Sequence, residues 1–190
     1  MNAVEELVKR VVAGDLAAYE TFVKRFQRLV GHIVFRMVDN QADREDIAQD
    51  VFVKIYQNLP GFQFECKVST WIGKITFNTC ANYLAKKKTP LLGDLGPKEA
   101  TADDFTDDRA RPDEMVEAND ISSHLRREIA GLPVVYRTVL TFYHLEEMTY
   151  GEIARIMDLP MNTVKSHLFR ARKALKERLM SKFLLEDLCR

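Results

Sequence analysis

The stretch TYGEIARIMDLPMNTVKSHLFRARKAL, residues 149–175, holds two short helical patterns separated by a tight break. Thr149 can cap the first helix, and Glu152, three residues later, completes a capping box. After the break at 158–162, the second helix keeps its apolar residues on one face. These residues are Val164, Leu168, Ala171 and Leu175. The pattern predicts a helix-turn-helix, whose second helix fits the major groove of DNA.

The remaining faces of that second helix are basic. Residues 162–182 contain seven Lys or Arg residues and one acidic residue, which gives a net charge of +6. The first turns of such a helix can reach base edges, while Lys and Arg further along can meet phosphates. The alternative interpretation is a solvated basic face on an ordinary helical bundle.

Helical spacing of apolar residues also extends through the first half of the chain. It predicts a short helix around residues 8–12, a long buried helix from Leu16 to Met37, a third helix ended by Pro60-Gly61 and a fourth from Thr70 to about Lys88. The expected N-caps are Asp15, Asp43 and Ser69, respectively, for the last three. No run alternates with period two, so the sequence predicts no sheet.

Between these helices and the C-terminal ones lies an acidic stretch. Residues 93–120 contain ten acidic and three basic residues, a net charge of −7, and few large apolar side chains. Such a segment cannot offset its ordering entropy, so it is predicted to be flexible. We therefore expect an all-α chain of two small helical domains, 1–92 and 122–182, joined by an acidic flexible linker, 93–121, and followed by a tail, 183–190.

Bulk composition limits the remaining classes. The 190 residues carry 28 basic and 28 acidic side chains, and the three Cys are too scattered for a disulfide framework or a zinc site. The chain shows neither a long apolar span nor a secretory signal, so we expect a cytoplasmic protein without a membrane span. It shows no catalytic set and no Gly-rich phosphate loop. We expect no enzyme activity, no cofactor, no metal and no small-molecule substrate.

Residues 132–175, LPVVYRTVLTFYHLEEMTYGEIARIMDLPMNTVKSHLFRARKAL, resemble region 4 of the extracytoplasmic-function (ECF) family of bacterial sigma factors. DREDIAQDVFVKIYQNLPGF (43–62) and STWIGKITFNTCANYL (69–84) resemble region 2 of the same family. The resemblance implies an initiation factor that binds core RNA polymerase. It would read the minus-35 promoter element as duplex and the minus-10 element as a melted strand. It also implies an anti-sigma factor as an inhibitory partner.

In region 4 the resemblance implies a set of minus-35 DNA contacts. Arg170 can bind guanine with two hydrogen bonds and Phe169 can touch a thymine methyl group, although packing within the module is the alternative for Phe169. Arg172 and Lys173 suit phosphates, and His167 is expected at the edge of the DNA. The full set is Thr163, Lys165, Ser166, His167, Phe169, Arg170, Arg172 and Lys173.

In region 2 the resemblance implies a site for the melted minus-10 strand. Aromatic rings can stack on unpaired bases, an amide can bind base edges, and lysines can follow the backbone. The candidates are Phe62, Phe64, Trp71, Lys74, Asn78, Asn82 and Lys86. Core packing is the alternative for Trp71, and Cys66 and Lys67 depart from the family's pattern in this loop.

A third set lies off the apolar stripe of the third helix. The resemblance places it against the clamp helices of the largest polymerase subunit, with the flap of the second subunit as a further contact of the chain. The set is Asp46, Gln49, Asp50, Phe52 and Tyr56. Aromatic side chains among carboxylates suit an interface, and an ordinary solvated face is the alternative.

Two other functions stay open at this point. The chain could be a free-standing helix-turn-helix regulator with a helical sensor domain, which would bind palindromic sites as a homodimer. It could also mimic a sigma factor and sequester an inhibitor, in which case changing Lys165 or Arg170 to Ala would have little effect.

Overall fold

The computed structural model describes the backbone of residues 3–87 and 121–188, with side chains for 3–87 and 124–181. Every regular element in these ranges is helical, so the all-α prediction is confirmed. The first module consists of α1 (Ala3–Val12), α2 (Leu16–Met37), α3 (Gln41–Asn58), the short η1 (Leu59–Gly61) and α4 (Val68–Lys86). The second consists of α5 (Ile121–Ala130), α6 (Val134–Leu140), the π-helical turn η3 (Thr141–Leu145), α7 (Tyr150–Met157) and α8 (Met161–Leu188). The predicted acidic linker lies outside the described residues except for its last residue.

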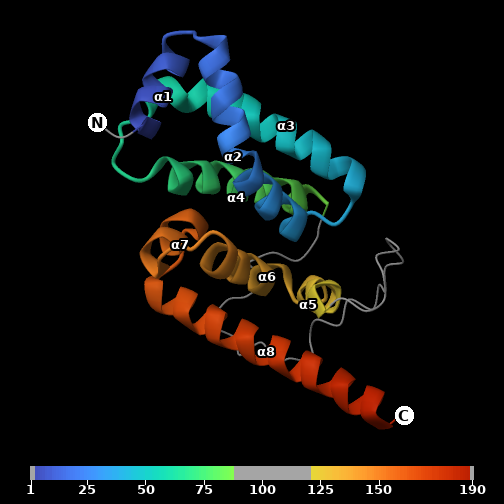
Figure 1. Cartoon of the computed structure of the whole chain (residues 1–190). Coiled ribbons are helices and arrows are strands. Elements are labelled where there is room, and N and C mark those ends of the chain that lie inside the picture. The colour runs from blue at the N-terminus through green and yellow to red at the C-terminus, as the bar shows by residue number, and fades with distance from the viewer. Residues whose placement is uncertain (1–2, 88–120, 189–190) are drawn as a thin grey trace.

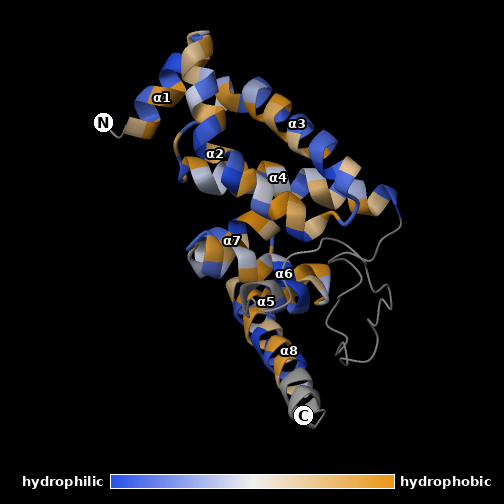
Figure 2. Cartoon of the chain, turned by 45° about the vertical axis from the view of Figure 1, so that its right-hand side comes forward, coloured by the Kyte–Doolittle hydropathy of each residue, from blue (hydrophilic) through white to orange (hydrophobic). Residues whose placement is uncertain are grey.

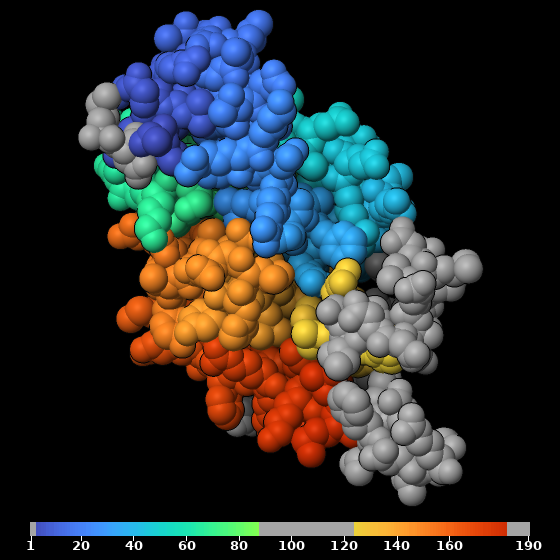
Figure 3. Space-filling view, viewed as in Figure 1, coloured from blue at the N-terminus to red at the C-terminus, as the bar shows by residue number. Residues whose placement is uncertain are grey.

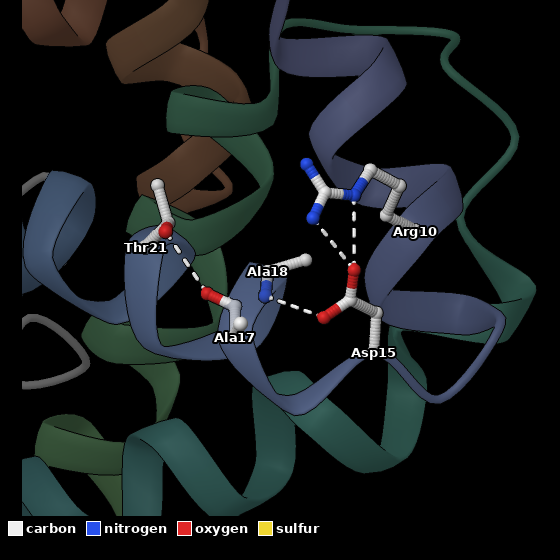
Figure 4. A network of polar contacts seen from close by, with 5 residues as sticks. All are labelled: Arg10, Asp15, Ala17, Ala18 and Thr21. Carbon is white, nitrogen blue, oxygen red and sulfur yellow. Dashed lines mark hydrogen bonds and ion pairs between the residues drawn. The ribbon is translucent and has the colours of Figure 1, made fainter.

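The turn between α1 and α2 is fixed by a glycine and a cap (Figure 4). Gly14 has φ of 89°, which favours glycine because it lacks a Cβ. Asp15 Oδ1 accepts a hydrogen bond from Ala18 N–H at 3.0 Å, and Asp15 Oδ2 accepts from Arg10 Nε at 3.0 Å and Nη2 at 2.6 Å. The predicted N-cap at Asp15 is confirmed.

We expect Asp15→Asn to lower the Tm slightly and Asp15→Ala to lower it further, because Asn keeps an acceptor for Ala18 but loses the pair with Arg10. The hydrogen bond from Ala18 and that from Arg10 lower the pKa of Asp15 below its ordinary 3.8. A lowered pKa stabilises the fold above that ordinary value, and the contribution is lost as pH falls through the lowered pKa. Thermal unfolding should therefore show the gap between wild type and Asp15→Asn closing in acid. A gap that stays constant with pH would contradict this account.

Two predicted caps are wrong. Helix α3 begins at Gln41 because Asn40 is its N-cap, whose side chain accepts from Asp43 N–H at 3.3 Å. Asp43 instead accepts from the Tyr83 hydroxyl and from Lys87 Nζ, which joins α3 to the end of α4. Helix α4 begins one residue before Ser69, with Lys67 at the cap position and no side-chain capping bond.

The modules pack against each other around a continuous core. Helix α2 packs on α1, α3 and α4, and it also contacts α6 of the second module. Helix α4 packs on α7, and α8 packs on α5, α6 and α7. Figure 1 shows α6 and α7 lying between α4 and α8. In the space-filling view the atoms of the second module abut those of the first along their shared boundary (Figure 3).

Candidate nucleic-acid and polymerase interfaces

The turn before α8 is built as the sequence predicts. Thr149 Oγ1 accepts from Glu152 N–H at 3.3 Å, and Glu152 Oε2 accepts from Thr149 N–H at 2.8 Å, so the capping box is confirmed. Helix α7 ends where Asp158 adopts a left-handed conformation, with φ of 54° and ψ of 46°. Leu159 N–H donates to Ala154 C=O at 3.0 Å, and α8 begins after Pro160. This geometry fixes the angle at which α8 leaves α7.

One face of α8 anchors it to the module. Val164 and Ala171 are completely buried and Leu168 is 1% exposed. Helix α8 rests through this seam on α6 and α7. Hydrophilic and hydrophobic residues alternate along α8 in Figure 2, as expected for a helix with a single buried face. The opposite face is therefore held outward on a rigid support.

That outward face carries most of the predicted minus-35 residues. Phe169 is 69% exposed, so the alternative of packing within the module does not hold in this structure. Thr163 is half-buried at the start of the helix. The other exposed members are Lys165, Ser166, Arg170, Arg172 and Lys173.

Aromatic rings from the neighbouring elements position two of these cations. Tyr143 and Tyr150 stack with ring centroids 5.2 Å apart. The Arg172 guanidinium lies 5.0 Å from the Tyr143 centroid and contacts His144 Nε2 at 3.3 Å, while Lys165 Nζ lies 5.8 Å from the Tyr150 centroid. The sequence reading missed this tyrosine pair. Its signal was the presence of Tyr143 and Tyr150 on either side of the capping box, although only the fold brings them together.

His167 is placed differently from the other predicted contacts. It is 9% exposed, and its ring centroid lies 6.1 Å from that of Tyr136 on α6. Burial, together with the nearby Arg170 charge, lowers its pKa, which favours the neutral imidazole. In this structure His167 thus belongs to the packed seam of α8 rather than to its exposed face.

The predicted minus-10 aromatics come together at the start of α4. Phe62 lies with its ring centroid 4.8 Å from Phe64 and 5.0 Å from Trp71. Phe64 has φ of 58°, an uncommon conformation for a bulky residue, and its side chain is 39% exposed. Trp71 is half-buried, so one part of the ring packs while the rest faces solvent. The cluster presents aromatic surface beside the first turn of α4.

Polar residues continue this surface along α4. Lys74, Asn78, Asn82 and Lys86 are exposed and spaced by three or four residues from Trp71 onward. Such spacing puts them on one side of the helix. Phe77 is 6% exposed and belongs to the core. The structure therefore arranges an aromatic cluster, two amides and two lysines in one line.

The outer face of α3 carries the predicted polymerase contacts. Asp46, Gln49 and Asp50 are exposed, Tyr56 is 44% exposed, and Phe52 is half-buried. Tyr19 of α2 holds this end of the face. Its hydroxyl donates to Phe52 C=O at 3.1 Å, and its ring meets Tyr56 edge-on with centroids 4.9 Å apart.

Val53 was missed in this face. It is 52% exposed and lies three residues from Asp50 and Tyr56, so it shares their side of α3. Its position off the stripe of Ile47, Val51 and Ile55 was a signal in the sequence. An exposed valine beside Tyr56 adds apolar surface to an otherwise acidic face.

Within residues 3–87 and 124–181, His, Cys, Asp and Glu side chains form no group of three suited to a metal ion. Among the described helices, none combines the length and apolar character needed to cross a bilayer.

A basic recognition helix behind a capped turn, together with a second helix lined by aromatic and amide groups, defines a two-module nucleic-acid-binding protein of the helix-turn-helix class. Residues 22–89 match the model of sigma-70 region 2, and residues 123–175 match that of sigma-70 region 4. The chain therefore belongs to the sigma-70 family of RNA polymerase sigma factors, in its ECF group.

Individual relatives agree with this assignment. The chain is 35% identical over 175 residues to the ECF RNA polymerase sigma-E factor of Escherichia coli strain K12, an alignment covering 89% of this chain and 90% of that protein. It is 30% identical over 180 residues to the ECF sigma factor SigW of Bacillus subtilis, covering 93% and 96%. Its fold matches the sigma factor RpoE of Bartonella quintana, solved with the anti-sigma factor NepR, with a TM-score of 0.64 at 16% identity, covering 85% of this chain and 98% of that one.

Proposed function

We propose that this sigma factor binds core RNA polymerase in the cytoplasm and directs it to promoters by reading two DNA elements in different states. Residues 122–182 would read the minus-35 element as duplex, and residues 1–92 would bind the polymerase and read the minus-10 element as a melted strand. The observation that carries the proposal is the presence of two chemically different nucleic-acid surfaces on separate modules of one chain.

The α8 surface suits duplex DNA. Its exposed cations can neutralise phosphates, and Arg170 and Phe169 project from the early turns of the helix, where base edges in the major groove come within reach. Because α8 is anchored by Val164, Leu168 and Ala171, it can enter the groove without rearranging. The Arg172 guanidinium is already oriented by Tyr143, which favours a phosphate contact in a fixed place.

The α4 surface suits single-stranded DNA. Melting exposes base faces and Watson–Crick edges, which aromatic and amide side chains can bind, and each stacked base contributes about 1–3 kcal/mol. Phe64 and Trp71 offer rings, Asn78 offers an amide, and Lys74 and Lys86 can follow the backbone. The polymerase would carry out the chemistry while this chain supplies the choice of site.

The α3 face suits the polymerase. Its carboxylates complement a basic partner helix, and Val53, Phe52 and Tyr56 can act as apolar anchors. This agrees with the clamp helices of the largest subunit as the docking site, with the flap of the second subunit meeting region 4. An anti-sigma factor is a further expected partner, since the Bartonella quintana relative was solved with one.

The test is run-off transcription with purified core polymerase on a promoter library randomised in both elements. We expect transcripts from promoters that share two sequence blocks at a fixed spacing. Lys165→Ala should relax the upstream block and Asn78→Ala the downstream block, because the two side chains lie on different modules. Absence of specific initiation, or tight binding of the isolated chain to palindromic sites, would overturn the proposal.

A further inference from the structure

The two modules meet through a compact group of side chains that the proposed DNA contacts do not use. We call this group the latch, and it consists of Lys67, Thr70 and Gly73 on the side of α4 and Met148, Glu152 and Ile156 on the side of α7. Glu152 Oε1 accepts from Lys67 Nζ at 2.9 Å and from Thr70 Oγ1 at 3.4 Å. Its other oxygen, Oε2, caps α7. One carboxylate thus completes the turn of region 4 and ties it to region 2.

Close packing at Gly73 gives the latch its apolar half. A Cβ at this position would lie 3.0 Å from Ile156 Cδ1 and 3.7 Å from Met148 Cε. Ile156 is completely buried and Thr70 is 3% exposed. Helices α4 and α7 can approach this closely because residue 73 has no side chain.

Two ion pairs flank the latch on the α2 side. Arg137 Nη2 of α6 lies 2.9 Å from Asp39 Oδ1, and the Arg137 side chain is 9% exposed. His32 Nδ1 of α2 lies 2.5 Å from Glu146 Oε1. Partly buried charges are costly to leave without partners, so these pairs favour one relative orientation of the modules.

This orientation does not fit the promoter geometry that the proposed function requires. Helix α8 packs on α7, which packs on α4, and two helix packings of about 8–10 Å put the axes of α4 and α8 about 20 Å apart. Elements at minus-35 and minus-10 lie about 25 base pairs apart, which is about 85 Å at 3.4 Å per base pair. The 33 residues from 88 to 120 can reach over about 110 Å if the chain is extended. The linker therefore allows the promoter spacing, whereas the latched form does not.

We propose that the latch is an autoinhibitory contact, which holds the free sigma factor closed and must open before both promoter elements can be bound. This inference rests on the proposed function. The latch leaves Trp71, Lys74 and Asn78 exposed, so it acts on the spacing of the two DNA surfaces rather than by covering them. Core polymerase, by binding the modules apart, would select the open form. The free closed chain would then pay no attention to isolated elements as a pair, since only one could be engaged at a time.

The electrostatic half of the latch is charged at physiological pH. Burial opposes ionisation of Glu152, but hydrogen bonds from Thr149 N–H and from Lys67 and Thr149 side chains outweigh it and lower its pKa to about 2. Its pair with Lys67 is therefore intact above its ordinary pKa of 4.5 and lost only as pH falls toward about 2. Opening at neutral pH must come from a competing partner and not from protonation of this carboxylate.

The test is small-angle scattering of the full free chain, with a wedge placed in the latch. Gly73→Gln introduces a good helix former whose side chain cannot fit against Ile156. Gly31→Gln makes the same change within α2, where a Cβ meets no atom within 4 Å, and serves as the matched control. We expect a radius of gyration near 16 Å for wild type and Gly31→Gln, the value for a compact chain of this length. Gly73→Gln should exceed about 25 Å, because a freed linker spans roughly 30 Å.

A second variant tests the charge alone. Glu152→Gln retains a capping-box residue but loses the pair with Lys67, so it should open the chain partly while α7 stays folded. At limiting core enzyme, Gly73→Gln should also need less protein for half-maximal transcription than Gly31→Gln. An extended wild-type chain, or a Gly73→Gln chain as compact as the control, would overturn the latch. Failure of every variant to direct initiation at saturating core enzyme would instead contradict the proposed function, and scattering would still decide the latch.

Discussion

Leu168→Ala is expected to destabilise the second module by about 2–5 kcal/mol, the usual cost of removing most of a buried leucine side chain. Leu168 is 1% exposed and lies in the middle of the seam that holds α8 on α6 and α7. Its neighbours on the seam, Val164 and Ala171, are fully buried and cannot move outward to fill the space. Urea unfolding followed by circular dichroism should show a lower midpoint, and DNA binding should fall because α8 loses its fixed angle.

Phe169→Ala is the matched control, since it removes a larger apolar side chain from the next residue. Phe169 is 69% exposed, so its loss should change the free energy of unfolding by no more than about 0.5 kcal/mol. It should nevertheless weaken minus-35 recognition if the ring touches a thymine methyl group. Equal destabilisation by the two substitutions would mean that α8 does not use one buried and one exposed face in solution.

Local patterns were enough to predict the helices and some of their caps. The capping box at Thr149 and Glu152 and the cap at Asp15 depend on residues within three positions of each other, so the sequence contains all the information. Asp43 looked like an equally good cap, but the structure uses Asn40 at the cap position. Asp43 is recruited by Tyr83 and Lys87, which lie about forty residues away along the chain. Competition between neighbouring candidate caps is decided by such distant partners.

Contacts between modules were beyond the reach of sequence patterns. The position of His167 against Tyr136, the stacking of Tyr143 on Tyr150 and the fit of Ile156 to Gly73 each join different elements. Helical periodicity identifies which side of a helix is apolar, but it does not say which helix will cover it. The exposed surfaces were easier to predict, because polar and basic residues on them need no partner within the chain.

Arg170→Ala is expected to reduce minus-35 recognition by about 1–3 kcal/mol, which is roughly 5- to 150-fold in affinity, if Arg170 makes a bidentate contact with guanine. Arg170 is exposed on the early part of α8, and among the described residues no ion pair holds it. Arg172, by contrast, is oriented by Tyr143 and His144. The loss should appear in binding of the polymerase–sigma complex to promoter fragments. It should be concentrated at one base pair of the element, where all four bases become nearly equivalent.

Lys173→Ala gives the comparison that separates base reading from charge. Lys173 is exposed one turn further along α8, where a phosphate contact would weaken binding evenly across sequences and reduce the salt dependence by about one ion. Both substitutions remove one positive charge, so a purely electrostatic role would make them equivalent in all promoters. Sequence preference altered by Arg170→Ala but unchanged by Lys173→Ala would assign base recognition to the first turns of α8. If both variants scale every promoter equally, α8 contributes charge alone, and the choice of promoter must come from the α4 surface.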